Sequence, residues 1–292
     1  MEKSLFPKSI RLFLIDGLPN GRVFAELSNW TGKVYKLPRT MVVQSEDRVD
    51  LAGTGVYLLF GKDPDDDSRD MVYIGESEEV YKRLRSHLEE KEFWNYAVVI
   101  ISKDDNLNKA HLKYLESKMY DRASEVKRYQ INNVNRPTCS AISEPDVAEM
   151  EEFFSNMVLL VSTLGFKVFD KMKQTPSEAR DEIIFHLSSA RGANARGQQT
   201  TEGFVVYQGS AAAKDVVDSF KGVRFRGTYN LRLKLMDDEV IKKEREELIF
   251  TQDYLFSSPS AAAMVILGRS ANGRTEWKTS EGKMLKDVEK DE

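Results

Sequence analysis

The stretch from Gly55 to Gly75 decides the fold of the N-terminal part of the chain. It reads GVYLLF at 55–60 and MVYIG at 71–75, with the polar run GKDPDDDSRD between them. Both apolar segments are short and rich in β-branched and aromatic residues, which is typical of strands, and proline with clustered aspartates interrupts a strand. We therefore predict a β-hairpin with a long acidic loop, whose two strands carry Tyr57 and Tyr73.

A helix is expected directly after the hairpin. Ser77 has the residue type of an N-cap, and apolar residues recur at 80, 84 and 88, which predicts one helix face packed on the sheet. Arg83 and His87 are one helical turn apart, so both side chains leave the same face. The alternative is an arginine on the helix surface and a histidine that only packs against a neighbour, and the spacing leaves it open.

Glu116 stands out in the next two elements. Residues 96–101 predict a strand buried on both faces, and residues 106–128 predict a helix on which Glu116 borders an apolar stripe. A carboxylate beside apolar surface is costly unless a cation compensates it, and one carboxylate with waters and substrate phosphate commonly holds Mg²⁺. A glutamate that reaches solvent or pairs with Lys113 or Lys118 is the alternative.

In this order and spacing, the two tyrosines, the Arg–His pair, the buried strand and the helical glutamate resemble the GIY-YIG nuclease family. The resemblance covers roughly residues 53–139, with valine in place of the signature isoleucine at position 56. It implies an α/β (α+β) fold with a small mixed sheet flanked by helices. It also implies metal-dependent hydrolysis of phosphodiester bonds in DNA, with a single divalent cation, Mg²⁺ or Mn²⁺, as cofactor.

The resemblance also assigns roles to residues. The tyrosine of the first motif would act as general base or position the water, the arginine would stabilise the charge that develops on the phosphate, and the other tyrosine and the histidine would orient water and phosphate. The glutamate would ligate the metal, an asparagine would shape the site, and Gly75 would permit a tight turn from strand to helix. The catalytic set carried over to this sequence is Tyr57, Tyr73, Arg83, His87, Glu116 and Asn133.

The rest of the chain suggests further segments. We predict an N-terminal α/β extension over residues 1–52, then the nuclease domain over 53–139, and a helical segment over 140–187 that packs on this domain or leads away from it. The run SSARGANARGQQTTEG at 188–203 is small and polar with no apolar period, so we predict a flexible linker there. Residues 204–292 would form a small C-terminal α+β module.

The C-terminal module has its own resemblance. The runs FSSPSAAA at 256–263 and GRSANG at 268–273 are similar to an uncharacterised domain that often follows bacterial GIY-YIG nucleases, and distantly to RAMA-type modules, for which reading of modified DNA has been proposed. The alternative is a solvated basic surface around a structural tryptophan. The residues expected to contact DNA are Arg224, Arg226, Arg232, Lys234, Arg269, Arg274 and Trp277.

Composition limits the class of protein. The chain has 292 residues, 41% hydrophobic and 31% charged, and contains no apolar run long enough to span a bilayer, which predicts a globular protein of two domains in the cytoplasm. One cysteine and three histidines exclude an intramolecular disulfide and structural zinc sites of the Cys₄ or Cys₂His₂ type. The net charge of −4 neither supports nor excludes DNA binding, because local patches decide where phosphate docks.

Two other functions remain alternatives. A catalytically inactive nucleic-acid-binding protein could retain the fold, although it would be expected to lose the arginine or the glutamate first. A structural adaptor whose C-terminal module binds protein would leave the nuclease-like residues unexplained. For a nuclease, plain, modified or branched DNA, or even RNA, stays open as substrate, and a homodimer or two successive cuts would be needed to cleave both strands.

Overall fold

The chain forms two compact units. The computed structural model describes residues 6–64, 66–170, 183–245 and 247–291, and it divides the chain at Asp170 and Lys171. Each unit combines one β-sheet with helices, so the predicted α+β fold class is confirmed. None of the described helices has both the length and the apolar character needed to cross a membrane.

The first unit is built on a seven-stranded sheet with the order β1-β2-β3-β6-β4-β5-β7. Neighbouring strands are antiparallel, except that β5 and β7 are parallel. The strands are β1 (Ile10–Leu14), β2 (Val23–Leu27), β3 (Gly32–Pro38), β4 (Gly55–Asp63), β5 (Asp66–Ser77), β6 (Trp94–Ser102) and β7 (Gln130–Ile131).

The predicted hairpin is the pair β4 and β5, in which Tyr57 faces Gly75 across the strands. Strand β6 lies on the other side of β4, and its residues 97–101 are fully buried. Burial on both faces explains why this strand reads as an unbroken run of Ala, Val and Ile rather than as an alternating pattern.

Three helices surround this sheet: α1 (Val80–Glu90), α2 (Lys109–Val126) and α3 (Glu144–Thr163). Helix α2 begins where the Asn108 side chain accepts hydrogen bonds from the amides of Ala110 and His111. The N-cap predicted at Ser77 for α1 is wrong. Ser77 ends β5, its hydroxyl accepts a hydrogen bond from the amide of Glu79, and Glu79 itself occupies the N-cap position.

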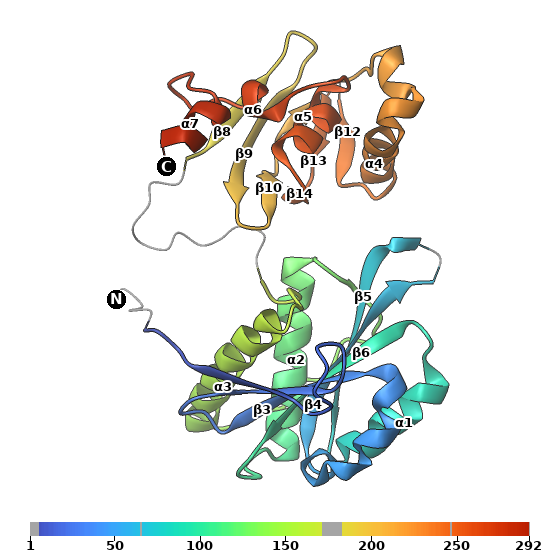
Figure 1. Cartoon of the computed structure of the whole chain (residues 1–292), viewed down its shortest axis with the longest axis vertical. Helices are drawn as coiled ribbons and strands as arrows, with labels where there is room; N and C mark the ends of the chain where they lie inside the picture. The colour runs from blue at the N-terminus through green and yellow to red at the C-terminus, as the bar shows by residue number, and fades with distance from the viewer. Residues whose placement is uncertain (1–5, 65, 171–182, 246, 292) are drawn as a thin grey trace. The chain divides into compact units, whose positions relative to one another are not determined.

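The helices cover the two faces of the sheet separately. Helices α2 and α3 pack over one face, on a cluster that includes Val56, Ile74 and Leu115 (Figure 1). Helix α1 and three short 3₁₀ helices, η1 (Arg39–Met41), η2 (Val43–Asp47) and η3 (Val49–Ala52), cover the other face. Tyr57 belongs to this second layer, so successive residues of β4 point to opposite sides of the sheet.

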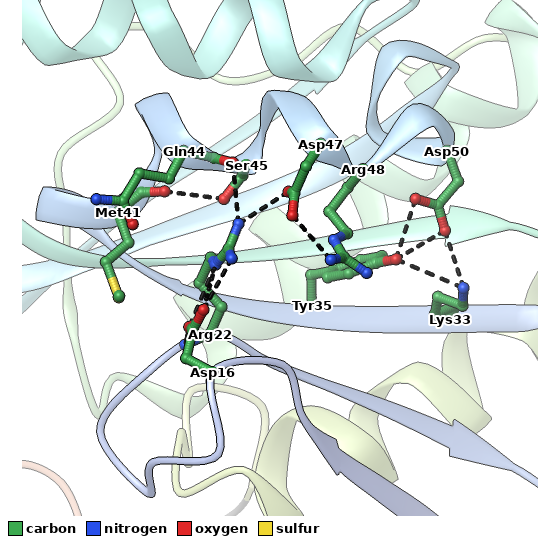
Figure 2. A network of polar contacts seen from close by, with 10 residues as sticks. All are labelled: Asp16, Arg22, Lys33, Tyr35, Met41, Gln44, Ser45, Asp47, Arg48 and Asp50. Atoms are coloured by element: carbon green, nitrogen blue, oxygen red, sulfur yellow. Dashed lines mark hydrogen bonds and ion pairs between the residues drawn. The ribbon is translucent and has the colours of Figure 1, made fainter.

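A polar network fixes the 3₁₀ segment to the N-terminal strands. The buried guanidinium of Arg22 forms ion pairs with Asp16 and Asp47, each at 2.8 Å. A few residues further on, the hydroxyl of Tyr35 donates to Asp50 at 2.7 Å (Figure 2). The described part of the extension predicted at 1–52 therefore shares the sheet, the layers and the core of the predicted nuclease domain.

The second unit has a sheet of seven strands in the order β12-β13-β11-β9-β10-β14, with β8 paired to β9. Its strands are β8 (Phe185–Ser188), β9 (Asn194–Thr200), β10 (Gly203–Val206), β11 (Ala211–Ala212), β12 (Ile241–Glu244), β13 (Glu247–Phe250) and β14 (Tyr254–Phe256). Its α-helices are α4 (Arg226–Asp237), α5 (Pro259–Leu267), α6 (Gly273–Glu276) and α7 (Leu285–Asp291).

The flexible linker predicted at 188–203 is wrong, because β9 is a strand of this sheet that pairs with β8, β10 and β11. Ala195 is buried and Gly197 lies under the Phe204 ring, where an added Cβ would approach a ring carbon to 2.5 Å. Because the buried positions of this strand hold small residues, its sequence does not show the alternation of apolar and polar residues that predicts a strand. Part of the segment predicted at 140–187, residues 171–182, lies outside the described residues.

Candidate active site

Tyr57 and His87 form the buried centre of the predicted site. The Tyr57 hydroxyl lies 2.9 Å from Nε2 of His87, and both side chains are almost completely shielded from solvent. Burial raises the pKa of Tyr57, whereas burial and then the charge of Arg83 lower the pKa of His87 to about 4. Both groups are therefore neutral at neutral pH and joined by one hydrogen bond.

Gly75 leaves the space that Tyr57 occupies. A Cβ added at this position would lie 2.4 Å from the Tyr57 hydroxyl oxygen. The role predicted for Gly75 in a tight turn is wrong, since the residue lies within β5, two residues before the strand ends. Gly75 is instead required because any side chain at this position would collide with the ring of Tyr57.

Tyr73 extends this cluster towards solvent. Its ring contacts the rings of Tyr57 and His87, with centroids 6.3 Å and 5.2 Å away. Lys91, which the sequence reading missed, holds its Nζ 4.4 Å from the centroid of the Tyr73 ring. The signal was present in the sequence, because residues 83, 87 and 91 repeat at four-residue spacing along α1 and just beyond its end.

Arg83 lies beside the same cluster and is partly exposed. Burial alone would lower the pKa of Arg83. The neighbouring Tyr57 hydroxyl and other groups outweigh this effect, so the pKa of Arg83 is raised overall. One guanidinium nitrogen lies 3.4 Å from a carboxylate oxygen of Glu90, and the other oxygen of Glu90 lies 3.3 Å from Nδ1 of His87. Glu90 thus faces both basic groups of the helix, and the predicted neighbourhood of Arg83 and His87 is present.

Glu116 comes from the opposite layer of the unit, on α2, and is partly buried. Burial, and then the negative charge of Glu76, raises the pKa of Glu116 to about 7. The negative charge of Glu116 makes a minor contribution to the raised pKa of Tyr57. Lys118 pairs with Glu151 instead, so the alternative pairing of Glu116 with Lys118 is not formed.

The surroundings of Glu116 fit a divalent cation. Within the described parts of the chain, no donor or cation forms a hydrogen bond or ion pair with this carboxylate, and Lys113 acts on it only electrostatically. The same described residues contain no group of three His, Cys, Asp or Glu side chains that would enclose a metal. A cation here would be held by one carboxylate and would take its other ligands from water and substrate, as Mg²⁺ commonly does.

The side chain of Asn133 forms hydrogen bonds with the backbone of β5, the second strand of the hairpin. Its side-chain oxygen accepts from the amide of Ile74 at 2.9 Å, and its side-chain nitrogen donates to the carbonyl of Ile74 at 2.7 Å. The parallel pairing of β7 with β5 covers only Met71 and Val72 of β5. The side-chain amide of Asn133 bonds to Ile74 beyond them, so it extends the hydrogen bonding along this edge of β5. Asn133 therefore shapes the site through the backbone of β5.

The acidic loop of the hairpin is partly neutralised by its own bases. Lys62 pairs with Asp70 at 2.6 Å, and Arg69 pairs with Asp66 at 3.3 Å. Repulsion of a polyanion by this loop is correspondingly weaker than its acid count suggests.

Two of the residues predicted to contact DNA are buried in the C-terminal unit. Trp277 is fully shielded, donates its indole N–H to the carbonyl of Pro259 at 3.0 Å and packs on Phe204. Arg232 is also buried and donates to the carbonyls of Val265 and Ala213. The predictions that Trp277 stacks on a base and that Arg232 binds phosphate are wrong, because both side chains hold this unit together.

The other five predicted residues lie nearer the surface. Arg269 and Arg274 form ion pairs with Glu276 and Glu289, at 2.9 Å and 2.7 Å. The remaining three lie along α4 and the segment that precedes it, with Arg224 and Arg226 exposed and Lys234 partly exposed. DNA binding by these five residues stays a prediction.

Comparison with known proteins identifies only the second unit. Residues 185–289 match a family described as Domain of unknown function (DUF4357), which agrees with the predicted uncharacterised C-terminal domain. The match starts at the first residue of β8, so it includes the segment misread as a linker. No curated protein and no solved structure was found to match the chain.

Proposed function

We propose that the N-terminal unit is a metal-dependent DNA endonuclease with a GIY-YIG-type active site. One observation supports this proposal above all: a buried, neutral Tyr57–His87 pair lies beside Arg83, and the carboxylate of Glu116 is partly buried with no ion pair among the described residues. A packing role accounts for the two tyrosines. It does not account for a partly buried carboxylate on α2 that forms no ion pair with any described residue.

The pair is arranged to move a proton. An attacking water would pass its proton to Oη of Tyr57 while the Tyr57 proton moves to Nε2 of His87, 2.9 Å away. A low pKa keeps His87 unprotonated and able to accept this proton at neutral pH. Nδ1 of His87 forms no hydrogen bond with any described residue, but the carboxylate of Glu90, 3.3 Å away, would stabilise the imidazolium through its charge.

The charged residues around the pair suit a phosphate. Arg83 would contact the non-bridging oxygens, where charge grows in the transition state, because its planar guanidinium binds two oxygens at once. Lys91 would contact a neighbouring phosphate of the same strand. A divalent cation at Glu116 would supply Lewis-acid stabilisation of the leaving oxygen.

The C-terminal unit is proposed to recognise the DNA, through the exposed bases that precede and follow the start of α4. Arg224 and Arg226 are accessible, and the sequence contains no acid within residues 221–234, although Arg232 of this run is buried. Such a surface favours phosphate contacts without specifying sequence. A modified or branched DNA substrate and a RAMA-like reading function remain part of this proposal.

Incubation of the whole chain with supercoiled plasmid in Mg²⁺ or Mn²⁺ tests the nuclease. We expect relaxed or linear product that chelator abolishes and that Glu116→Gln and Arg83→Ala both lack. Arg85→Ala and Glu125→Gln serve as matched controls on the same two helices, because Arg85 bonds Tyr81 and Glu125 pairs with Arg122, away from the proposed site.

Cleavage that survives in Glu116→Gln would contradict the assigned site. A wild-type protein that shifts DNA in a salt-dependent manner but cleaves neither plain, modified nor branched DNA would instead support the inactive binding protein.

A further inference from the structure

The outer strand of the first sheet exposes apolar side chains at an open edge. Strand β1 pairs with β2 and with no other strand in the described parts of the chain. Leu12 and Phe13 are about half exposed, at 53% and 49%, and Leu14 is exposed as well. Soluble proteins usually protect such an edge with charges, proline or a bulge, whereas β1 has Arg11 as its one charge and pairs in unbroken register.

The hydrogen-bond pattern shows which backbone groups face outward. Ser9 accepts from the amide of Ser28, and the amide of Ile15 donates to Arg22, so the odd-numbered residues of β1 bond to β2. The even-numbered residues, Ile10, Leu12 and Leu14, direct their N–H and C=O groups away from the sheet. Three consecutive outward positions are sufficient for a short antiparallel ladder.

We infer that a second copy of this chain pairs with β1 along this edge, antiparallel and centred on Leu12. The two Leu12 residues then exchange both backbone hydrogen bonds about a two-fold axis, and Ile10 of each copy bonds with Leu14 of the other. Arg11 faces Phe13 of the second copy at the non-hydrogen-bonded positions, where side chains come closest.

This register is self-complementary. Arginine opposite phenylalanine allows a cation–π contact, and no two like charges face each other. Additional apolar surface lies at both ends of the strand, since Phe6 before it and Leu18 in the turn after it are 76% and 55% exposed. A two-fold axis brings each of these side chains to the interface twice, which suits a second copy better than a single apolar segment from another protein.

Substitutions at Phe13 test both the pairing and its register. Phe13→Arg places two arginines opposite each other in both halves of the ladder, whereas Phe13→Glu places a carboxylate opposite Arg11. Both variants lose the same stacking on Phe24, at 5.1 Å, so they share this loss of packing within one copy. Sedimentation equilibrium across micromolar concentrations measures the mass of each variant.

We expect the wild type and Phe13→Glu to reach twice 33.4 kDa, and Phe13→Arg to dissociate at least tenfold more readily. Leu12→Pro should also be monomeric, because it removes an outward amide without breaking a bond to β2. Val49→Lys, an exposed apolar residue outside β1, is the control and should remain dimeric.

A wild type that is monomeric at all concentrations would overturn the inference, as expected if another part of the same chain covers β1. Dimers that persist in Phe13→Arg and Leu12→Pro, or a Phe13→Glu variant as monomeric as Phe13→Arg, would also overturn it. None of these masses depends on catalysis, so the result is separate from that of the plasmid assay.

Discussion

Arg83 and Arg232 both lie on a helix that packs beside the sheet of its own unit, but their surroundings differ. Arg83 is partly exposed and faces a tyrosine hydroxyl and one distant carboxylate oxygen. Arg232 is buried, and its donors are taken by backbone carbonyls near the end of α5. The first arginine is available to an anionic ligand and the second is part of the fold, although both read from sequence as bases suited to phosphate.

The largest expected effect is a loss of stability that is confined to the C-terminal unit. Trp277→Ala removes a fully buried ring from the core of the C-terminal unit and should destabilise that unit by about 3–5 kcal/mol. Differential scanning calorimetry of the whole chain should show the loss or a large shift of one transition. Arg274→Ala is the control, because an exposed ion pair contributes about 1 kcal/mol or less. Equal stability of the two variants would show that Trp277 is not a core residue.

In the N-terminal unit the arginine should affect turnover rather than folding. Arg83→Ala should lower the rate of plasmid nicking by about 10²–10³-fold, since it removes a donor aimed at developing charge. The melting temperature of this variant should stay near that of the wild type, because the ion pair of Arg83 with Glu90 is long, at 3.4 Å, and partly exposed. A comparable loss of rate in Arg85→Ala would show that Arg83 has no specific role and that the positive charge of α1 as a whole determines the rate.

These contrasts show what the sequence could and could not predict. The hairpin, β6 and α2 follow from apolar patterns, which act locally. Strand β9 could not be recognised, because Ala195 and Gly197 are buried without being strongly apolar. The burial of Arg232 had a weak signal, since it lies three residues before the buried Leu235 on the same helix face.

Glu116 gives a smaller, pH-dependent effect. In an unfolded chain its carboxyl ionises near 4.5, whereas in the folded unit its pKa is raised to about 7. As the pH rises, the unfolded state therefore releases this proton at a lower pH than the folded state does. The stability associated with the protonated carboxyl is fully present below pH 4.5 and is lost as the pH rises through about 7.

Glu116→Gln should thus stabilise the first unit by about 1–2 kcal/mol at pH 8, allowing for partial exposure, and leave it unchanged at pH 4. Urea unfolding at the two pH values measures this difference. Added Mg²⁺ should stabilise the wild type at pH 8 and have little effect on the glutamine variant. A stabilisation by Mg²⁺ that is equal in both proteins would show that Glu116 does not hold the cation.

The smallest effect concerns the exposed bases of the second unit. Arg224→Ala with Arg226→Ala should weaken DNA binding severalfold and reduce the salt dependence of log K by about 2, with no change in melting temperature. Fluorescence anisotropy at several salt concentrations measures this slope. The double variant Arg269→Ala with Arg274→Ala should change the slope less, because its arginines already have carboxylate partners.

The order of strands in the first sheet has a consequence for the dimer proposed above. Tyr57 lies on β4, four strand spacings from β1 and so about four and a half spacings, or roughly 22 Å, from the two-fold axis at about 4.8 Å per spacing. Adjacent strands are rotated by roughly 20–25°, so nine spacings between the two β4 strands turn the two α1 faces by roughly half a revolution. The paired molecule would then present its catalytic faces back to back, which predicts that each dimer bridges two separate duplexes, as a pull-down between a tethered and a free DNA would reveal.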